Sequence, residues 1–324
     1  MLKLPVVDVA KLRDGSPSER REAAAALGAA CREIGFFCIT GHGVDRPQRA
    51  ALLDAARRFF AQSPVDKDAL SIKRSPHNRG YVGLESESLD PARGVDRKEA
   101  FNIGLELAPD APEIREGRPL RGVNFWPDLP GWKALMLDYY DRCLEIGRVL
   151  HRGFCLDLGL EDEAFFDPMI DRPAAVLRLL HYPPAVAGEG PTAQPAAGEH
   201  TDYGNITLLV TDGVAGLEVR SLGGEWLGVA DTGDLILCNI GDCLMRWTND
   251  VYRSTPHRVS IPARERYSIA FFLDLNPDAR VDPADLDPRQ APKYPPVTVG
   301  DYLLGRLTAT YDHLRQASPG AAAT

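Results

Sequence analysis

The chain has 324 residues, 44% of them hydrophobic and 26% charged, a balance typical of a globular protein with a sizeable core. Its formal net charge of -9 argues against a nucleic-acid partner, because no basic patch offsets the acidic excess. No run of about 18 apolar residues occurs and the first residues lack a secretory signal, so we expect no membrane span.

The N-terminal part of the chain reads as strand, helix, strand and helix. Residues 4–8 form a short apolar run that predicts a strand. Ser16 is a helix cap, with Pro at the next position and Glu three residues on, and the helix that it starts is expected to end at Gly35. Residues 36–40 then predict a second strand, and a second helix is expected to start near Asp45.

The middle of the chain combines an irregular region with a long helix. Residues 62–130 are rich in proline, glycine and charge, so we expect a long irregular segment of the kind that forms lids and binding loops. Between Trp132 and Leu158 the apolar positions keep helical spacing, which predicts one scaffold helix ending near Gly159.

The second half changes to short β-rich runs separated by turn residues, a pattern typical of an antiparallel sandwich or barrel. After Ser318 the chain is rich in small residues, and we expect this tail to be disordered. The β-rich runs are residues 175–182, 206–210, 217–219, 235–239, 255–261 and 267–273.

One pair of potential metal ligands stands out in this second half. His200 and Asp202 are two residues apart, a spacing that places both side chains on one face of a strand. His257, in a later β-rich run, is the candidate third ligand. Two histidines and one carboxylate leave three coordination positions open, which is the facial triad of Fe(II) oxygenases. The other histidines read as structural, and they are His42, His77, His151, His181 and His313.

A His-x-Asp pair alone occurs by chance in many chains, so the argument needs the residues that follow His257. If residues 262–265 form the turn of a hairpin, Arg266 and Ser268 come to the same face as His257, because cross-strand partners share a face. Arg258 then alternates to the opposite face and is not expected to reach the metal.

Arg266 and Ser268 together predict a receptor for a carboxylate, since a guanidinium offers a bidentate fork and a hydroxyl adds a donor. Tyr182, at the end of an earlier strand, could add a phenolic donor. The candidates for the substrate pocket are Arg79, Tyr81, Phe101 and Phe272. For each of them, core packing or surface solvation is an equally good interpretation.

Eight motifs follow one another along almost the whole chain. They occupy residues 35–44, 96–104, 200–209, 216–219, 239–242, 247–249, 257–259 and 266–268. In this order and at these separations they resemble the isopenicillin N synthase-like family of Fe(II)/2-oxoglutarate dioxygenases. The resemblance implies a mainly β fold with flanking helices, a distorted double-stranded β-helix or jelly roll.

The resemblance also divides the chain and assigns its site. It implies an N-terminal non-haem dioxygenase region (1–130), a scaffold helix (131–170), a jelly-roll core (171–280) and a C-terminal helix and tail (281–324). The residues that it implies as iron ligands are His200, Asp202 and His257, and those that it implies for the distal carboxylate of 2-oxoglutarate are Arg266 and Ser268, with Tyr182 assisting.

Two positions depart from the pattern of plant members of the family. Leu180 stands where these members have Asn, which affects the surroundings of the co-substrate and the role of Tyr182. Asp250 stands in place of Gly, a change that a turn tolerates because Asp also adopts turn conformations.

The predicted function is oxidation of a small molecule, by hydroxylation or desaturation, with Fe(II), 2-oxoglutarate and O2, releasing succinate and CO2. The alternatives are an ethylene- and succinate-forming enzyme, an oxidase of the same fold that does not use 2-oxoglutarate, and a module that only binds a small acid. The six cysteines form no C-x-x-C pair, so we expect reduced thiols in a cytoplasmic protein. We expect a monomer or weak homo-oligomer whose partner is a small molecule, not a nucleic acid or a membrane.

Overall fold

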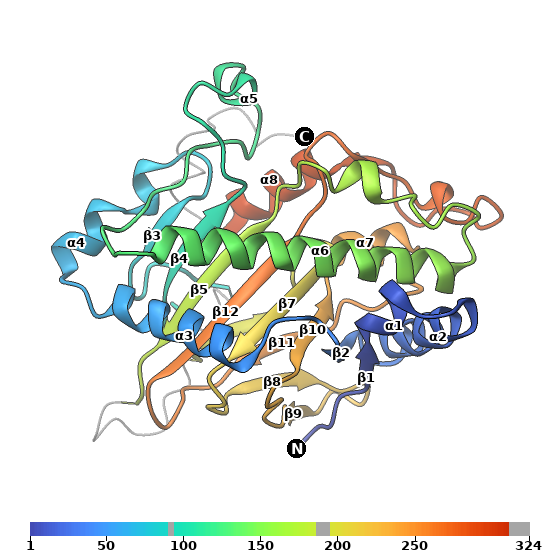
Figure 1. Ribbon diagram of the computed structural model, residues 1–324, viewed down its shortest axis with the longest axis horizontal. Coiled ribbons are helices and arrows are strands. Elements are labelled where there is room, and N and C mark those ends of the chain that lie inside the picture. The colour runs from blue at the N-terminus through green and yellow to red at the C-terminus, as the bar shows by residue number, and fades with distance from the viewer. Residues whose placement is uncertain (90–93, 186–194, 311–324) are drawn as a thin grey trace.

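The computed structural model describes residues 1–89, 94–185 and 195–310, and its centre is an eight-stranded sheet (Figure 1). Neighbouring strands of this sheet run antiparallel except for the first pair, which is parallel. In order across the sheet the strands are β1 (Val6–Asp8), β2 (Phe36–Thr40), β10 (Ile236–Ile240), β7 (Ile206–Thr211), β12 (Arg266–Leu273), β5 (Val176–Tyr182), β4 (Glu99–Gly104) and β3 (Gly80–Val82).

A smaller sheet of four strands lies against one face of the large sheet. Its strands, in order, are β6 (Ala197–His200), β11 (His257–Val259), β8 (Leu217–Arg220) and β9 (Trp226–Gly228). A separate two-stranded ribbon pairs β13 (Arg280–Val281) with β14 (Val297–Thr298). The mainly β prediction with flanking helices is therefore confirmed.

Helices cover the other face of the large sheet, where α6 crosses the strands (Figure 1). The longer helices are α2 (Pro17–Glu33), α3 (Arg46–Phe60) and α6 (Trp132–Leu158), together with α8 (Val299–Thr310), which lines the cavity side through Leu303, Leu307 and Thr310. The shorter ones are α1 (Val9–Asp14), α4 (Pro64–Ala69), α5 (Pro112–Arg115) and α7 (Asp242–Trp247), with single 3-10 turns at Ile72–Arg74, Asp167–Met169 and Pro283–Asp285.

The helix ends follow the capping residues in the sequence. The Ser16 side chain accepts from the Glu19 backbone, and the Glu19 carboxylate accepts from the Ser16 N–H at 2.9 Å, so the predicted capping box is present. α6 begins after Gly131 and stops at Gly159, both with positive φ, which confirms the predicted scaffold helix.

Each strand of the large sheet alternates between two apolar layers. Residues such as Leu177, Leu179 and Phe271 pack with the helices, whereas Leu180 and Ala270 face the small sheet. The helix side is a continuous core, while the side toward the small sheet holds a cavity lined by both sheets. The fold thus reserves one face of the large sheet for packing and the other for a site.

The prediction that residues 62–130 are irregular is wrong in part. This stretch contributes α4, α5, β3 and β4, and all six residues of β4 are buried in the sheet. β4 includes Glu99, which in the sequence argues against a buried strand. In the structure its carboxylate is satisfied by Lys67 at 2.7 Å and by His181 at 2.8 Å.

The predicted hairpin between residues 255–261 and 267–273 is also wrong. β11 pairs with β6 and β8 in the small sheet, whereas β12 pairs with β5 and β7 in the large sheet. Alternation along a strand determines which face a side chain takes, but it does not determine which strand lies alongside. The strands β6, β9, β13 and β14 and the helix α7 were not expected from the sequence.

The C-terminal prediction is tested only as far as residue 310. α8 supplies the expected C-terminal helix, while the predicted tail after Ser318 and His313 lie outside the described residues. None of the helices in the described ranges is long and apolar enough to cross a membrane.

The contact between α2 and α6 yields a stability prediction at Gly28. A Cβ on Gly28 would lie 2.0 Å from the Asp157 carboxylate, which Arg32 and Tyr252 each bind at 2.6 Å. Although alanine favours helices, we expect Gly28→Ala to lower the free energy of unfolding by about 1–3 kcal/mol, the usual effect of overpacking.

The matched control is Gly305→Ala in α8, where a Cβ meets no atom within 4 Å. This variant should be neutral or stabilised by up to about 1 kcal/mol. Urea unfolding followed by circular dichroism measures both changes, and a Gly28→Ala variant as stable as the control would contradict the packing argument.

Candidate metal centre and carboxylate receptor

Three potential metal ligands converge in the cavity between the sheets. His200, Asp202 and His257 each offer one ligand atom, and these atoms all lie within 4.8 Å of one another. The two imidazole rings are 4.3 Å apart at their centroids, and His257 Nε2 lies 3.7 Å from Asp202 Oδ1. In the part of the chain that the structure describes, this is the one such cluster of His, Cys, Asp and Glu side chains.

The two histidines meet because their strands pair. His200 is the last residue of β6 and His257 the first of β11, and the two are direct cross-strand partners. The two-residue spacing between His200 and Asp202 predicted that both side chains lie on one face of a strand, but Asp202 reaches the cluster in another way. β6 ends at His200, so Asp202 lies in the backbone beyond the strand and does not share a strand face with His200.

Polar side chains of the large sheet hold Asp202 in place. Its Oδ2 accepts from Asn239 Nδ2 at 2.6 Å and from Thr207 Oγ1, which lie on β10 and β7. With Oδ2 occupied in this way, Oδ1 is the oxygen that faces His257. The carboxylate therefore connects the two sheets at the cluster.

Backbone carbonyls set the histidine tautomers. His200 Nδ1 lies 2.7 Å from the Gly198 oxygen, and His257 Nδ1 lies 3.2 Å from the Thr255 oxygen. Because a carbonyl only accepts, each Nδ1 carries the proton and each Nε2 keeps a free lone pair. Such second partners orient the histidines in metal sites.

The protonation states suit a metal ion. Burial, reinforced by the neighbouring His257, lowers the pKa of His200 to about 3, so its imidazole is neutral at ordinary pH. Burial opposes ionisation of Asp202, but the two histidines and the bonds from Thr207 and Asn239 outweigh it and lower the pKa of Asp202. Two imidazoles and one carboxylate fit a divalent ion such as Fe(II).

The side chains predicted to form a carboxylate receptor also line the cavity. Arg266 is buried, its Nε donates to the Val214 oxygen at 3.2 Å, and its Nη1 lies 3.4 Å from Ser268 Oγ. Tyr182 is its cross-strand partner, with the guanidinium carbon 4.8 Å from the ring centroid. No ion pair among the described residues involves Arg266. A buried guanidinium without a carboxylate fits the acid group of a ligand.

The arginine that the hairpin argument excluded is indeed elsewhere. Arg258 Nε donates to Glu218 Oε2 at 2.7 Å, its guanidinium lies over the Trp226 ring, and it does not line the cavity. Arg266 and Ser268 share the cavity with His257, as expected, but they face it from the opposite sheet. Arg266 and Ser268 therefore lie near His257 as predicted, although β11 and β12 do not form the hairpin from which this was predicted.

The four candidate substrate residues separate into two pairs. Arg79 and Phe272 line the cavity. Tyr81 lies outside it and donates to Glu99 at 2.6 Å, and Phe101 packs between Phe59 and Trp132 in the core.

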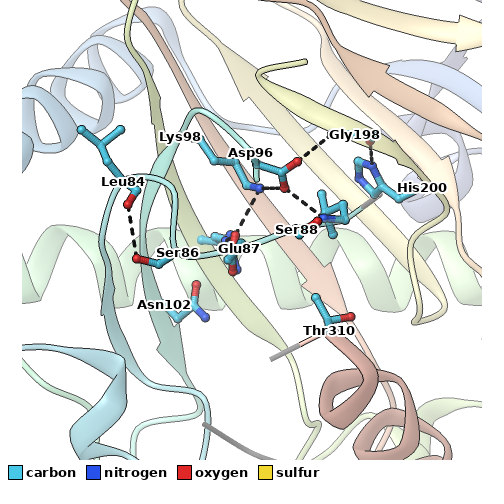
Figure 2. A network of polar contacts seen from close by, with 12 residues as sticks. Leu84, Ser86, Glu87, Ser88, Asp96, Lys98, Asn102, Gly198, His200 and Thr310 are labelled. Carbon is cyan, nitrogen blue, oxygen red and sulfur yellow. Dashed lines mark hydrogen bonds and ion pairs between the residues drawn. The ribbon is translucent and has the colours of Figure 1, made fainter. Parts of the chain in front are cut away.

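Sequence reasoning missed a charged network behind His200 (Figure 2). Asp96 Oδ1 accepts from the Gly198 N–H at 2.9 Å, and the carbonyl of Gly198 orients His200. Lys98 pairs with Asp96 and, at 3.2 Å, with Glu87. Asp96 and Lys98 lie in the motif of residues 96–104, and this motif was the feature of the sequence that could have indicated the network.

The two departures from the family pattern have clear places in the structure. Leu180 lines the cavity, between Ser268 and Ala100 on the neighbouring strands. Asp250 has a φ of +66°, and its carboxylate binds Lys293 at 2.9 Å and Tyr294 at 2.6 Å. The turn therefore accepts Asp and uses its side chain.

Two family models match the chain. Residues 4–129 match the N-terminal region described as non-haem dioxygenase in morphine synthesis, and residues 173–275 match the 2OG-Fe(II) oxygenase superfamily. Among relatives, the 2-oxoglutarate-Fe(II) type oxidoreductase hxnY of Emericella nidulans is 35% identical over 95% of this chain and 90% of its own length. Homoarginine-6-hydroxylase 2-ODD-C23 of Glycine max is 32% identical over 95% of this chain and 96% of its own length.

Solved structures agree with these matches. A full-length protein of Neurospora crassa, in complex with alpha-KG and thymine, superposes with a TM-score of 0.81 at 31% identity, covering 94% of this chain and 96% of that one. This likeness confirms the jelly-roll prediction for the two facing sheets.

The geometry of the cluster predicts the effect of removing one ligand. His257→Ala should lower the affinity for Fe(II) by more than roughly 100-fold, because loss of even an outer partner of a metal ligand typically costs about 10- to 100-fold. Anaerobic titration calorimetry measures this affinity. His42→Ala is the control, because the His42 ring binds the Asp234 carbonyl outside the cluster. Equal affinities in the two variants would contradict the assignment.

Proposed function

The chain belongs to the 2OG-Fe(II) oxygenase superfamily, and from this membership we propose that His200, Asp202 and His257 hold its iron while Arg266 and Ser268 anchor its 2-oxoglutarate. The protein is an oxidoreductase that uses Fe(II), 2-oxoglutarate and O2 to oxidise a small molecule. The residue roles and the finer aspects of the reaction are the proposal.

One observation supports these roles best. The three potential ligands and the buried Arg266 line a single cavity, although they come from different sheets. A metal ion needs the three potential ligands. A five-carbon diacid needs the metal ion at one end and a cation, such as Arg266, for the carboxylate at its other end. Their common cavity fits one ligand that bridges the two.

When bound, iron would activate O2, the oxidant, while 2-oxoglutarate would supply two electrons and leave as succinate and CO2. The chain supplies positions and charges. The carbonyls of Gly198 and Thr255 keep both Nε2 lone pairs directed at the metal position, and Asp202 contributes one negative charge. Tyr182 covers the Arg266 guanidinium with its ring, which limits the orientations that the fork adopts.

Apolar residues separate these polar groups from one another. Leu180, Leu209, Leu237 and Ala270 line the cavity on the face of the large sheet. Such walls exclude water from the space around the metal, which strengthens the interactions of Arg266 and Asp202 and limits side reactions.

The alternative reactions differ in their products. The names of the relatives point to 2-oxoglutarate as co-substrate, and the Neurospora crassa protein holds alpha-KG together with thymine. These likenesses favour oxidation of a second small molecule over an ethylene- and succinate-forming reaction or an oxidase that does not use 2-oxoglutarate.

We also propose a cytoplasmic setting, a monomer or weak homo-oligomer, and the division into residues 1–130, 131–170, 171–280 and 281–324. The six cysteines are free and buried, which supports a reducing compartment. Oligomeric state remains a prediction.

Stoichiometry tests the reaction. With a suitable substrate, the enzyme should form about one succinate per O2 consumed and per substrate oxidised, since the two half-reactions are coupled. Oxygen electrode and chromatographic measurements give the three quantities. Ethylene as the main product, or oxygen uptake independent of 2-oxoglutarate, would overturn the proposal.

A pair of arginine variants tests the receptor. Arg266→Ala should weaken 2-oxoglutarate binding by about 2–5 kcal/mol, or tens to thousands of fold in Kd, because the ligand carboxylate loses its buried partner. Arg258→Ala should leave the Kd within about twofold, since Arg258 pairs with Glu218 outside the cavity. Similar Kd values for both variants would refute the assignment of Arg266.

A further inference from the structure

The cavity continues from the metal cluster to a second group of polar side chains, which we call the polar end. Figure 2 shows Asn102, Glu87 and Lys98 together in this region, and Thr310 of α8 lines the same cavity. The polar residues that line this end are Asn78, Glu87, Lys98, Asn102 and Arg178.

The polar end is separate from the carboxylate receptor. On β5, Tyr182 lies beside Arg266 of β12, whereas Arg178 lies beside Asn102 of β4. Arg178 and Tyr182 share a strand face and are four residues apart, roughly 13 Å at the rise of an extended strand. A five-carbon diacid held by Arg266 and the metal is too short to fill both ends, so the polar end remains for another molecule.

The charges of the polar end balance within the protein. Lys98 pairs with Asp96 and with Glu87, and Arg178 pairs with Glu87 as well. The guanidinium of the adjacent Arg79 donates to the carbonyl oxygens of His77, Asn78 and Leu120. Lys98 and Arg178 thus have carboxylate partners, which Arg266 lacks, and Arg79 is held by three carbonyl oxygens. The polar end therefore does not favour a charged ligand.

Asn102 supplies the specific hydrogen-bonding demand. Its side chain is fully buried, and its Nδ2 donates to Asn78 Oδ1 at 3.2 Å and to the Asn78 carbonyl at 3.4 Å. Because both partners are acceptors, the amide orientation is fixed and Oδ1 points elsewhere. Among the described residues Asn102 Oδ1 has no hydrogen-bond partner. A buried acceptor in this state favours a ligand that donates to it.

Apolar side chains also line this space. Phe272 lines the cavity from β12, and Leu120, Leu303 and Leu307 line it as well. Thr207, the cross-strand partner of Phe272, donates to Asp202, so the Phe272 ring lies close to the metal cluster. A planar ring can stack on Phe272 and present an edge to Asn102.

We propose that the polar end is the subsite for the substrate to be oxidised, and that it takes an uncharged planar heterocycle with an amide N–H beside a carbonyl, a lactam or cyclic imide. The N–H donates to Asn102 Oδ1, the ring lies on Phe272, and the carbonyl faces the edge that carries Arg178. This proposal rests on the proposed function, because it assumes that 2-oxoglutarate occupies the Arg266 end.

Binding measurements on the intact protein test this subsite. The protein is loaded anaerobically with Mn(II) and 2-oxoglutarate, and thymine, 2-pyridone and hydantoin are titrated by calorimetry. Each is compared with its fully N-methylated counterpart and with benzoate, an anion of similar size. We expect at least one of the three to bind, at least about fivefold more tightly than its methylated form and than benzoate, since methylation removes the donor.

Two variants locate the effect. Asn102→Leu should weaken the bound lactam or imide by roughly 5- to 100-fold and Phe272→Ala by a similar factor, while the Kd of 2-oxoglutarate changes less than about twofold. The Arg266→Ala variant should show the reverse pattern. If Asn102→Leu does not fold, the comparison of N–H and N-methyl compounds with the unaltered protein decides alone.

The possible failures are distinguishable. If 2-oxoglutarate binds but none of the three compounds does, or if benzoate or the methylated forms bind equally well, the subsite proposal is wrong and the proposed function stands. If 2-oxoglutarate itself does not bind to the metal-loaded protein, the proposed function fails and the subsite proposal fails with it.

Discussion

The division of the Asp202 carboxylate between two sheets is the constraint on which the site depends. Asn239 and Thr207 of the large sheet hold one oxygen, which leaves the other to face His257 of the small sheet. The two histidines are fixed relative to each other by strand pairing, and Asp202 helps to fix them relative to the face that carries Arg266. A metal held by all three residues would therefore join two sheets that have no backbone pairing at this point.

Local signals in the sequence were sufficient for the long helices α2, α3 and α6 and for selecting the residues that meet in the cavity. The Ser16 cap and the apolar period of residues 132–158 depend on neighbours along the chain, so they could be read without tertiary structure. The strand that pairs with a given strand could not be read from local sequence, and for this reason β11 was wrongly paired with β12. β4 was missed for a related reason, because the partners that make Glu99 acceptable in a buried strand come from distant segments.

The N-terminal part of the chain has a larger share in the cavity than its irregular composition predicted. Asp96 reaches the β6 backbone and so supports His200, while Asn102 and Glu87 form part of the cavity wall. The core supplies the candidate ligands and the proposed carboxylate receptor, and part of the remaining cavity wall comes from Asn78, Arg79, Glu87, Leu89, Lys98 and Asn102. The candidate metal ligands and this part of the cavity wall thus come from different segments of the chain.

Arg266 has a further consequence for how long the protein survives. Its buried charge has no carboxylate partner among the described residues, so a diacid bound there as proposed would stabilise only the folded state. Degradation that starts from the unfolded chain then slows whenever the diacid is plentiful. The abundance of the protein would rise and fall with the supply of its own co-substrate, a form of metabolic feedback that needs no second binding site.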